Sequence, residues 1–187
     1  AAVFLLSGVF MYFWIKELTK KDLPAFTASV FYLFNPYHLI DVHFRATLGE
    51  STIFALTPLL FFLLTKCLIN KKLFFLISTS LITGFLLLSH PLVGAVILAI
   101  AALYIFSTTL NLKIETILLS LFALFIGVIS STYVWISFIL YSSYTFPNPT
   151  RDLTFAPFYQ LFYAPWRYGF LFQGPKGELA LFIGYSQ

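Results

Sequence analysis

Long stretches without a charged residue alternate with short charged segments along this chain. An α-helix needs about 20 apolar residues to cross ~30 Å of hydrocarbon, and about 17 is a practical minimum. The stretch 73–112 is long enough for two crossings, and Ser89-His90-Pro91 is its natural break because the residue before a proline leaves helical geometry. The pattern predicts an all-α integral membrane protein with about six transmembrane helices, the first truncated, over residues 1–16, 23–40, 51–69, 73–89, 92–110 and 114–140.

Composition agrees with a membrane protein and excludes other classes. Hydrophobic residues make up 60% of the chain, charged residues 10%, and the mean hydropathy is +0.92. A soluble domain carries roughly 25% charged residues, so an ordinary globular enzyme, a disordered segment and a disulfide scaffold are excluded. The net charge of +4 is too scattered to indicate nucleic acid binding, and the lone Cys67 forms no internal disulfide. We expect no cofactor and no metal site.

The two ends of the chain predict a piece of a longer protein. Residues 1–15 are apolar but slightly short for a crossing, and they lack the basic region and cleavage site of a signal peptide. The last residues, 184–187, carry no flanking charge. We therefore expect an internal fragment of a longer multi-pass protein.

The connections between the predicted spans alternate in charge. Loops at 16–22, 66–72 and 113–115 hold seven basic and three acidic residues, whereas the loops on the other side hold four of each. Lys and Arg near span ends mark the cytoplasm. We therefore expect residues 37–50, 89–92 and 141–187 on the extracytoplasmic side of the cell membrane, together with all three histidines and all three arginines.

The outer loop between the second and third spans is dense in ionisable groups. Asn35-Pro36 ends or kinks the preceding helix. If residues 37–47 are helical, His38, Asp41 and Arg45 share one face and the last two can pair. One interpretation is an interfacial helix held by a weak surface ion pair. The other is a functional polar cluster at the membrane surface, with a base and a phosphate-binding cation.

A resemblance to a known family is carried by Pro36-Tyr37, Asp41, Arg45 and Gly49-Glu50. This pattern resembles a prokaryotic multi-pass family labelled the 6-pyruvoyl-tetrahydropterin synthase-related membrane domain, and the best match covers about residues 28–65. That family is similar to membrane glycosyltransferases of superfamily C (GT-C), including those that glycosylate cell-envelope polymers. Soluble pterin synthases are compact α+β enzymes with a three-histidine zinc site, which this chain of spans does not resemble.

The resemblance implies a particular chemistry at the outer leaflet. GT-C enzymes take a sugar from a polyprenyl-phosphate carrier, an acidic residue deprotonates the acceptor hydroxyl, and cationic residues hold the lipid phosphate. On this chain it implies the catalytic residues Asp41 and Glu50. The substrate-binding residues of this cluster would be His38, His43, Arg45 and His90. Taken alone, a histidine before a proline at an outer turn, such as His90, is most often a water-bonded turn residue.

The last 47 residues are rich in aromatic side chains and proline. Between 155 and 166 the aromatic residues recur on one face of a helix. We expect residues 153–166 to form a short helix along the outer membrane surface. Its aromatic face either anchors it at the interface or forms a wall for a polyprenyl chain or sugar, the substrate-binding residues then being Tyr163, Trp166, Arg151 and Arg167.

Three functions stay open at this point. The first is a GT-C-like glycosyltransferase whose partners are the lipid bilayer and a polyprenyl-phosphate-linked sugar. The second is a multi-pass transporter or lipid flippase, which should carry ionisable or broken-helix sites near the bilayer midplane. The third is a non-catalytic membrane scaffold. Glycines within the spans most simply allow close helix packing: Gly84, Gly94 and Gly127.

Overall fold

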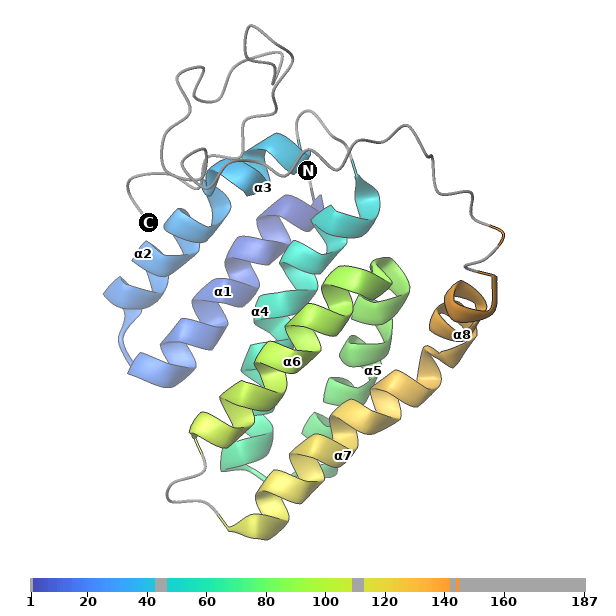
Figure 1. The fold of residues 1–187 in the computed structure, drawn as a ribbon. Coiled ribbons are helices and arrows are strands. Elements are labelled where there is room, and N and C mark those ends of the chain that lie inside the picture. Colours follow the sequence, from blue (N-terminus) through green and yellow to red (C-terminus); the bar gives the residue numbers. More distant parts are fainter. Residues whose placement is uncertain (1, 43–46, 109–112, 142–143, 145–187) are drawn as a thin grey trace, which may run out of the picture.

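The fold is all-helical in the part of the chain that the structure describes. A computed structural model describes residues 2–42, 47–108, 113–141 and 144, and these residues form helices and no strand. The predicted fold class is confirmed at this level. In chain order the helices are α1 (Ala2–Thr19), α2 (Asp22–Leu33), α3 (Pro36–Ile40), α4 (Leu48–Ile69), α5 (Leu73–Ser89), α6 (Pro91–Ser107), α7 (Ile114–Ser130) and α8 (Thr132–Tyr141) (Figure 1).

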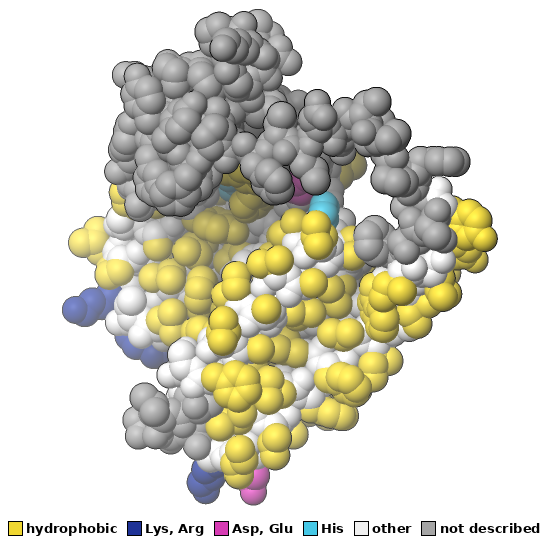
Figure 2. Space-filling view, viewed as in Figure 1, with side chains coloured by type: hydrophobic (Ala, Val, Ile, Leu, Met, Phe, Trp, Pro, Cys, Tyr) yellow, Lys and Arg dark blue, Asp and Glu magenta, His cyan; other side chains and the backbone are white. Residues whose placement is uncertain are grey.

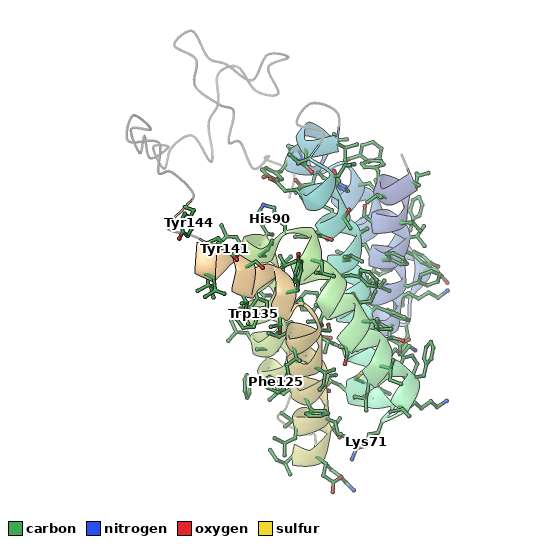
Figure 3. All side chains as sticks on the ribbon, turned by 90° about the vertical axis from the view of Figure 1, so that its right-hand side faces the viewer. Lys71, His90, Phe125, Trp135, Tyr141 and Tyr144 are labelled. Atoms are coloured by element: carbon green, nitrogen blue, oxygen red, sulfur yellow. The ribbon has the colours of Figure 1, made fainter. Side chains whose placement is uncertain are left out.

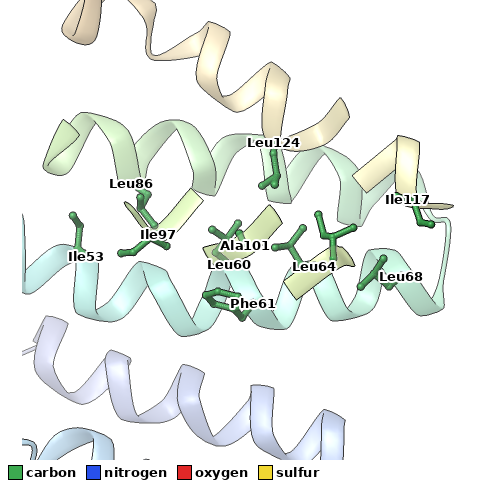
Figure 4. Packing of buried hydrophobic residues seen from close by; sticks show 11 residues of the cluster. Ile53, Leu60, Phe61, Leu64, Leu68, Leu86, Ile97, Ala101, Ile117 and Leu124 are labelled. Carbon is green, nitrogen blue, oxygen red and sulfur yellow. The ribbon is translucent and has the colours of Figure 1, made fainter. Parts of the chain in front are cut away.

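The longer helices lie side by side and alternate in direction (Figure 1). α1 packs against α2 and α4, and α5 packs against α4 and α7. A cluster of buried apolar side chains lies among α4, α5, α6 and α7 (Figure 4). Leu60 and Leu64 are fully buried on α4 and are four residues apart, so they share one face of that helix. Leu86 of α5 and Ile105 of α6 belong to the same cluster and are also fully buried.

The outer surface of the bundle is apolar as well (Figure 2). Large side chains point outward from several helices, including Leu23, Leu103 and Phe122, which are 76%, 67% and 58% exposed. A soluble monomer rarely exposes a continuous apolar surface of this kind, because contact between water and apolar area is unfavourable. The surface is suited to hydrocarbon as its solvent.

Two described helices are long and apolar enough to cross a membrane. They are α1, with 18 residues, and α4, with 22 residues. α7 and α8 pass the same test only as a pair, which is bent by 56°. α5 and α6 have 17 residues each, or about 26 Å at 1.5 Å per residue. The predicted count of six spans therefore stays a prediction.

Proline determines where several helices end. The range 23–40, which we predicted as one span with a break or kink at Asn35-Pro36, forms α2 and α3, which are separated at that proline. Pro36 disfavours helical geometry at Asn35, which has φ −54° and ψ 129°, and the Asn35 side chain accepts the Tyr37 N–H at 2.9 Å. The predicted break before Pro91 is confirmed, since α5 ends at Ser89 and α6 begins at Pro91.

Glycine brings α5 and α7 close together, as the sequence predicted. A Cβ atom added to Gly127 would lie 2.4 Å from Thr83 Cβ and 2.6 Å from the Ser80 carbonyl oxygen. Only a residue without a side chain fits against the α5 backbone at this distance. The close approach lets the Ser80 hydroxyl donate a hydrogen bond to the Ala123 carbonyl of α7 at 2.9 Å.

Lysine side chains gather at the end of the bundle where α1 and α4 end and α5 and α7 begin (Figure 2). Glu17 of α1 accepts from Lys20 at 2.6 Å and from Lys66 of α4 at 2.7 Å. Glu17 is 15% exposed, whereas Glu115, which pairs with Lys71 at 2.9 Å, is 72% exposed. Only the Glu17 pair is shielded enough from water to join two helices firmly.

We expect Glu17→Gln to lower the free energy of unfolding by about 1 kcal/mol, because it weakens two charge-assisted hydrogen bonds. Glu115→Gln is the matched control, and an exposed pair contributes about 0–1 kcal/mol. Thermal unfolding of the two variants in detergent micelles measures the difference. Equal midpoints for both variants would show that the α1–α4 ion pair adds nothing beyond a surface contact.

Candidate functional site

The described site residues lie at the end of the bundle opposite the lysines. This end comprises α3, the first turn of α4 and the turn between α5 and α6 (Figure 1). Figure 3 shows His90 at this end and Lys71 at the other. The histidines and carboxylates predicted to act together are therefore separated from the basic end by the length of the helices.

His38 binds a backbone carbonyl that a proline leaves without its usual helical donor. In a regular helix the Tyr32 carbonyl would accept the N–H of the fourth following residue, but Pro36 has no N–H. The Nδ1 atom of His38 lies 3.3 Å from that carbonyl oxygen and takes its place. Since a carbonyl only accepts, Nδ1 carries the hydrogen. α3 thus turns His38 back onto the end of α2.

The His38 ring is enclosed by aromatic side chains and has no solvent exposure. It stacks on Phe54 of α4, with ring centroids 4.4 Å apart, and its centroid lies 5.0 Å from that of Phe4. Burial lowers the pKa of His38 below its ordinary value of 6.5, although the Tyr32 carbonyl and the charge of Asp41 act in the opposite direction. The imidazole is therefore neutral at neutral pH.

Asp41 is also fully buried. Two hydroxyl groups from the start of α4 donate to its carboxylate: Thr47 to Oδ1, and Ser51 to Oδ2 at 3.0 Å. Asp41 follows α3, where its backbone N–H is bonded to the His38 and Tyr37 carbonyls. The carboxylate therefore connects the end of α3 to the start of α4, and Asp41 follows His38 by three residues in the chain.

Glu50 and His90 belong to the same end of the bundle. Glu50 is half-buried and accepts a hydrogen bond from the Tyr37 hydroxyl at 2.8 Å. A Cβ atom on the preceding residue, Gly49, would lie 2.5 Å from the Ser89 carbonyl oxygen. The start of α4 thus touches the α5–α6 turn directly beside His90. His90 Nδ1 accepts the Val93 N–H at 3.4 Å, which gives it a capping role at the start of α6.

Comparison with known families identifies the chain. The family model described as "6-pyruvoyl-tetrahydropterin synthase related domain; membrane protein" matches residues 1–164. The chain belongs to this family. No curated protein and no solved structure matches it. The predicted family and the membrane assignment are therefore confirmed, while the similarity to GT-C enzymes stays a prediction.

In this member of the 6-pyruvoyl-tetrahydropterin synthase related family, the structure describes four of the predicted site residues. They are His38, Asp41, Glu50 and His90, with the geometry given above. The other predicted positions lie outside the described residues: His43, Arg45, Arg151, Tyr163, Trp166 and Arg167. The same holds for the predicted surface helix over 153–166 and for the predicted pairing of Asp41 with Arg45.

Sequence reasoning missed the residues that hold this site in place. Thr47 and Ser51 donate to Asp41, and Tyr32 supplies the carbonyl for His38. A signal for Tyr32 was present, because it stands four residues before Pro36 and its carbonyl must find another donor. No comparable local signal marks Thr47 or Ser51. Among the described residues of this family member, no group of three His, Cys, Asp or Glu side chains could hold a metal ion.

Proposed function

We propose that the chain forms part or all of a GT-C-like membrane glycosyltransferase. It transfers a sugar from a polyprenyl-phosphate carrier to an acceptor hydroxyl on the extracytoplasmic face of a multi-pass bundle. The observation that supports this best is the gathering of Asp41, Glu50 and His38 at one end of an otherwise apolar bundle. Polar groups close to a bilayer are costly and tend to be functional.

The two carboxylates suit different tasks in such a reaction. Glu50 is half-buried and is oriented by the Tyr37 hydroxyl, so an acceptor hydroxyl can approach it. In the proposal Glu50 takes the proton of that hydroxyl, since a positioned carboxylate acts as a general base. Asp41 is fully enclosed and held by two hydroxyl groups, so it suits a binding role at a fixed position.

The charge distribution supports an extracytoplasmic site. In the described residues the lysines lie at the end opposite His38 and Asp41, at the junctions α1–α2 and α4–α5 and before α7. Basic residues near span ends favour the cytoplasm. If the lysine end of the bundle is cytoplasmic, the end that holds Asp41 and Glu50 faces the outer leaflet, where GT-C enzymes use their lipid-linked donors.

The test is sugar transfer by the intact protein in liposomes that contain radiolabelled undecaprenyl-phosphate hexoses. We expect Glu50→Gln to lower transfer about 100-fold or more, the range typical of losing a general base. Glu115→Gln, at the opposite end, is the matched control and should transfer sugar at the wild-type rate. Wild-type transfer by well-folded Glu50→Gln would remove Glu50 from the reaction. Absence of transfer by the wild type from glucose, mannose and galactose donors would contradict the proposed activity.

A lipid flippase is the second candidate, favoured by the bend of 56° between α7 and α8. Broken helices line the central sites of many transporters. Against it, the central turns of the two long spans, α1 and α4, carry no Asp, Glu, Lys, Arg or His side chain. A flippase would move a fluorescent polyprenyl phosphate between leaflets without consuming a sugar donor, and the same liposomes measure both events.

A further inference from the structure

The imidazole of His38 presents an unused hydrogen-bond acceptor. Because Nδ1 carries its hydrogen toward the Tyr32 carbonyl, Nε2 of the neutral ring carries a lone pair. Nε2 is buried and has no hydrogen-bond partner among the described residues. Leaving a buried polar atom unpaired costs about 1–3 kcal/mol. Such an atom near a candidate site indicates a ligand group that completes the hydrogen bond.

The surroundings of Nε2 define the chemistry of that group. Asp41 follows His38 by three residues in the chain, and its carboxylate, like Nε2, can only accept hydrogen bonds when ionised. The aromatic rings of Phe4 and Phe54 pack against the imidazole, so this end of the bundle offers two acceptors beside apolar rings. A phosphate brings only acceptor oxygens and negative charge, so it is repelled here. A hydroxyl group of a neutral sugar can donate a hydrogen bond and fits an aromatic enclosure.

We propose that His38 and Asp41 bind a hydroxyl group of the transferred sugar, while the phosphate of the carrier is held elsewhere. This inference rests on the proposed function and adds the orientation of the donor to it. Since the His38 ring has no solvent exposure, the hydroxyl reaches Nε2 only when a neighbouring side chain moves. Binding of the sugar hydroxyl therefore requires the side chains around His38 to repack at the same time.

Two substitutions separate the structural role of His38 from its binding role. His38→Asn keeps a donor in the place of Nδ1 and removes the acceptor in the place of Nε2. His38→Gln keeps an acceptor near Nε2 and removes the donor to the Tyr32 carbonyl. The affinities of the intact protein in nanodiscs are measured for undecaprenyl-phosphate hexoses and for undecaprenyl phosphate alone.

We expect His38→Asn to fold like the wild type and to bind the best hexose donor about 10-fold more weakly, as for the loss of one hydrogen bond. Its affinity for undecaprenyl phosphate alone should not change. His38→Gln should unfold at a lower temperature and keep most of its preference for the sugar-bearing lipid. If His38→Asn binds both lipids like the wild type, or loses both affinities equally, the inference is overturned.

Monodeoxy donors provide a second test that needs no folded variant. One deoxy analogue of the preferred hexose should bind the wild type about 10-fold more weakly, as expected for one missing hydrogen bond. That analogue should also bind wild type and His38→Asn equally well. If every deoxy analogue binds the wild type like the parent sugar, the inference fails while the proposed function stands. If the wild type binds no hexose donor more tightly than the bare carrier, the inference fails, and the transfer assay decides the proposed function separately.

Discussion

Gly127→Ala is expected to lower the free energy of unfolding by about 1–3 kcal/mol, the usual cost of forcing extra volume into a packed interior. The new methyl group would lie 2.6 Å from the backbone oxygen of Ser80, so α5 and α7 must move apart. Their separation would also break the hydrogen bond from Ser80 to Ala123. Thermal unfolding in detergent micelles, followed by circular dichroism, measures the loss.

Gly94→Ala is the matched control for this experiment. A Cβ atom there would first meet Leu86 Cδ2 at 3.0 Å, the end of a flexible side chain. We therefore expect a shift in unfolding temperature smaller than that of Gly127→Ala. A Gly127→Ala protein as stable as Gly94→Ala would contradict the close contact between the α5 and α7 backbones.

Tyr32→Phe is expected to lower the free energy of unfolding by about 1–3 kcal/mol, because it leaves a buried carbonyl without a donor. Pro58, inside α4, has no N–H for the carbonyl of Phe54, four residues earlier. The Tyr32 hydroxyl donates to that carbonyl at 2.7 Å. The Tyr32 hydroxyl therefore replaces the backbone hydrogen bond that Pro58 removes from α4.

A double-mutant cycle tests this explanation. In a Pro58→Ala background the new N–H can bond to the Phe54 carbonyl, so Tyr32→Phe should cost less than it does alone. Tyr104→Phe is the control. The Tyr104 hydroxyl bonds to Thr65 Oγ1 at 2.8 Å, and the Thr65 hydroxyl also donates to the Phe61 carbonyl. An equal cost of Tyr32→Phe in both backgrounds would show that the hydroxyl does not replace the missing N–H.

The sequence predicted those features that local chemistry decides. Proline marked the breaks at Asn35 and His90, and glycine marked the close contact at Gly127, because each effect depends on one residue and its nearest backbone.

The site was only partly predictable for a different reason. The spacing of three positions placed His38 and Asp41 on one helical face, and both side chains are fully buried at the same end of the bundle. Their partners come from other elements: Phe54 from α4, and Thr47 and Ser51 from beyond the loop. Such contacts depend on where α4 returns to α3, which no local pattern in the sequence specifies.

Tyr32 has a consequence for how this family can vary in sequence. The Tyr32 hydroxyl donates to the Phe54 carbonyl, which lacks a helical donor because of Pro58. The Tyr32 carbonyl, which lacks a helical donor because of Pro36, accepts from His38. Loss of either proline makes one donor redundant, and loss of a donor is tolerable only once the matching proline has gone. We expect family members to exchange Tyr32 and Pro58 as a linked pair, with the proline substituted first along each lineage.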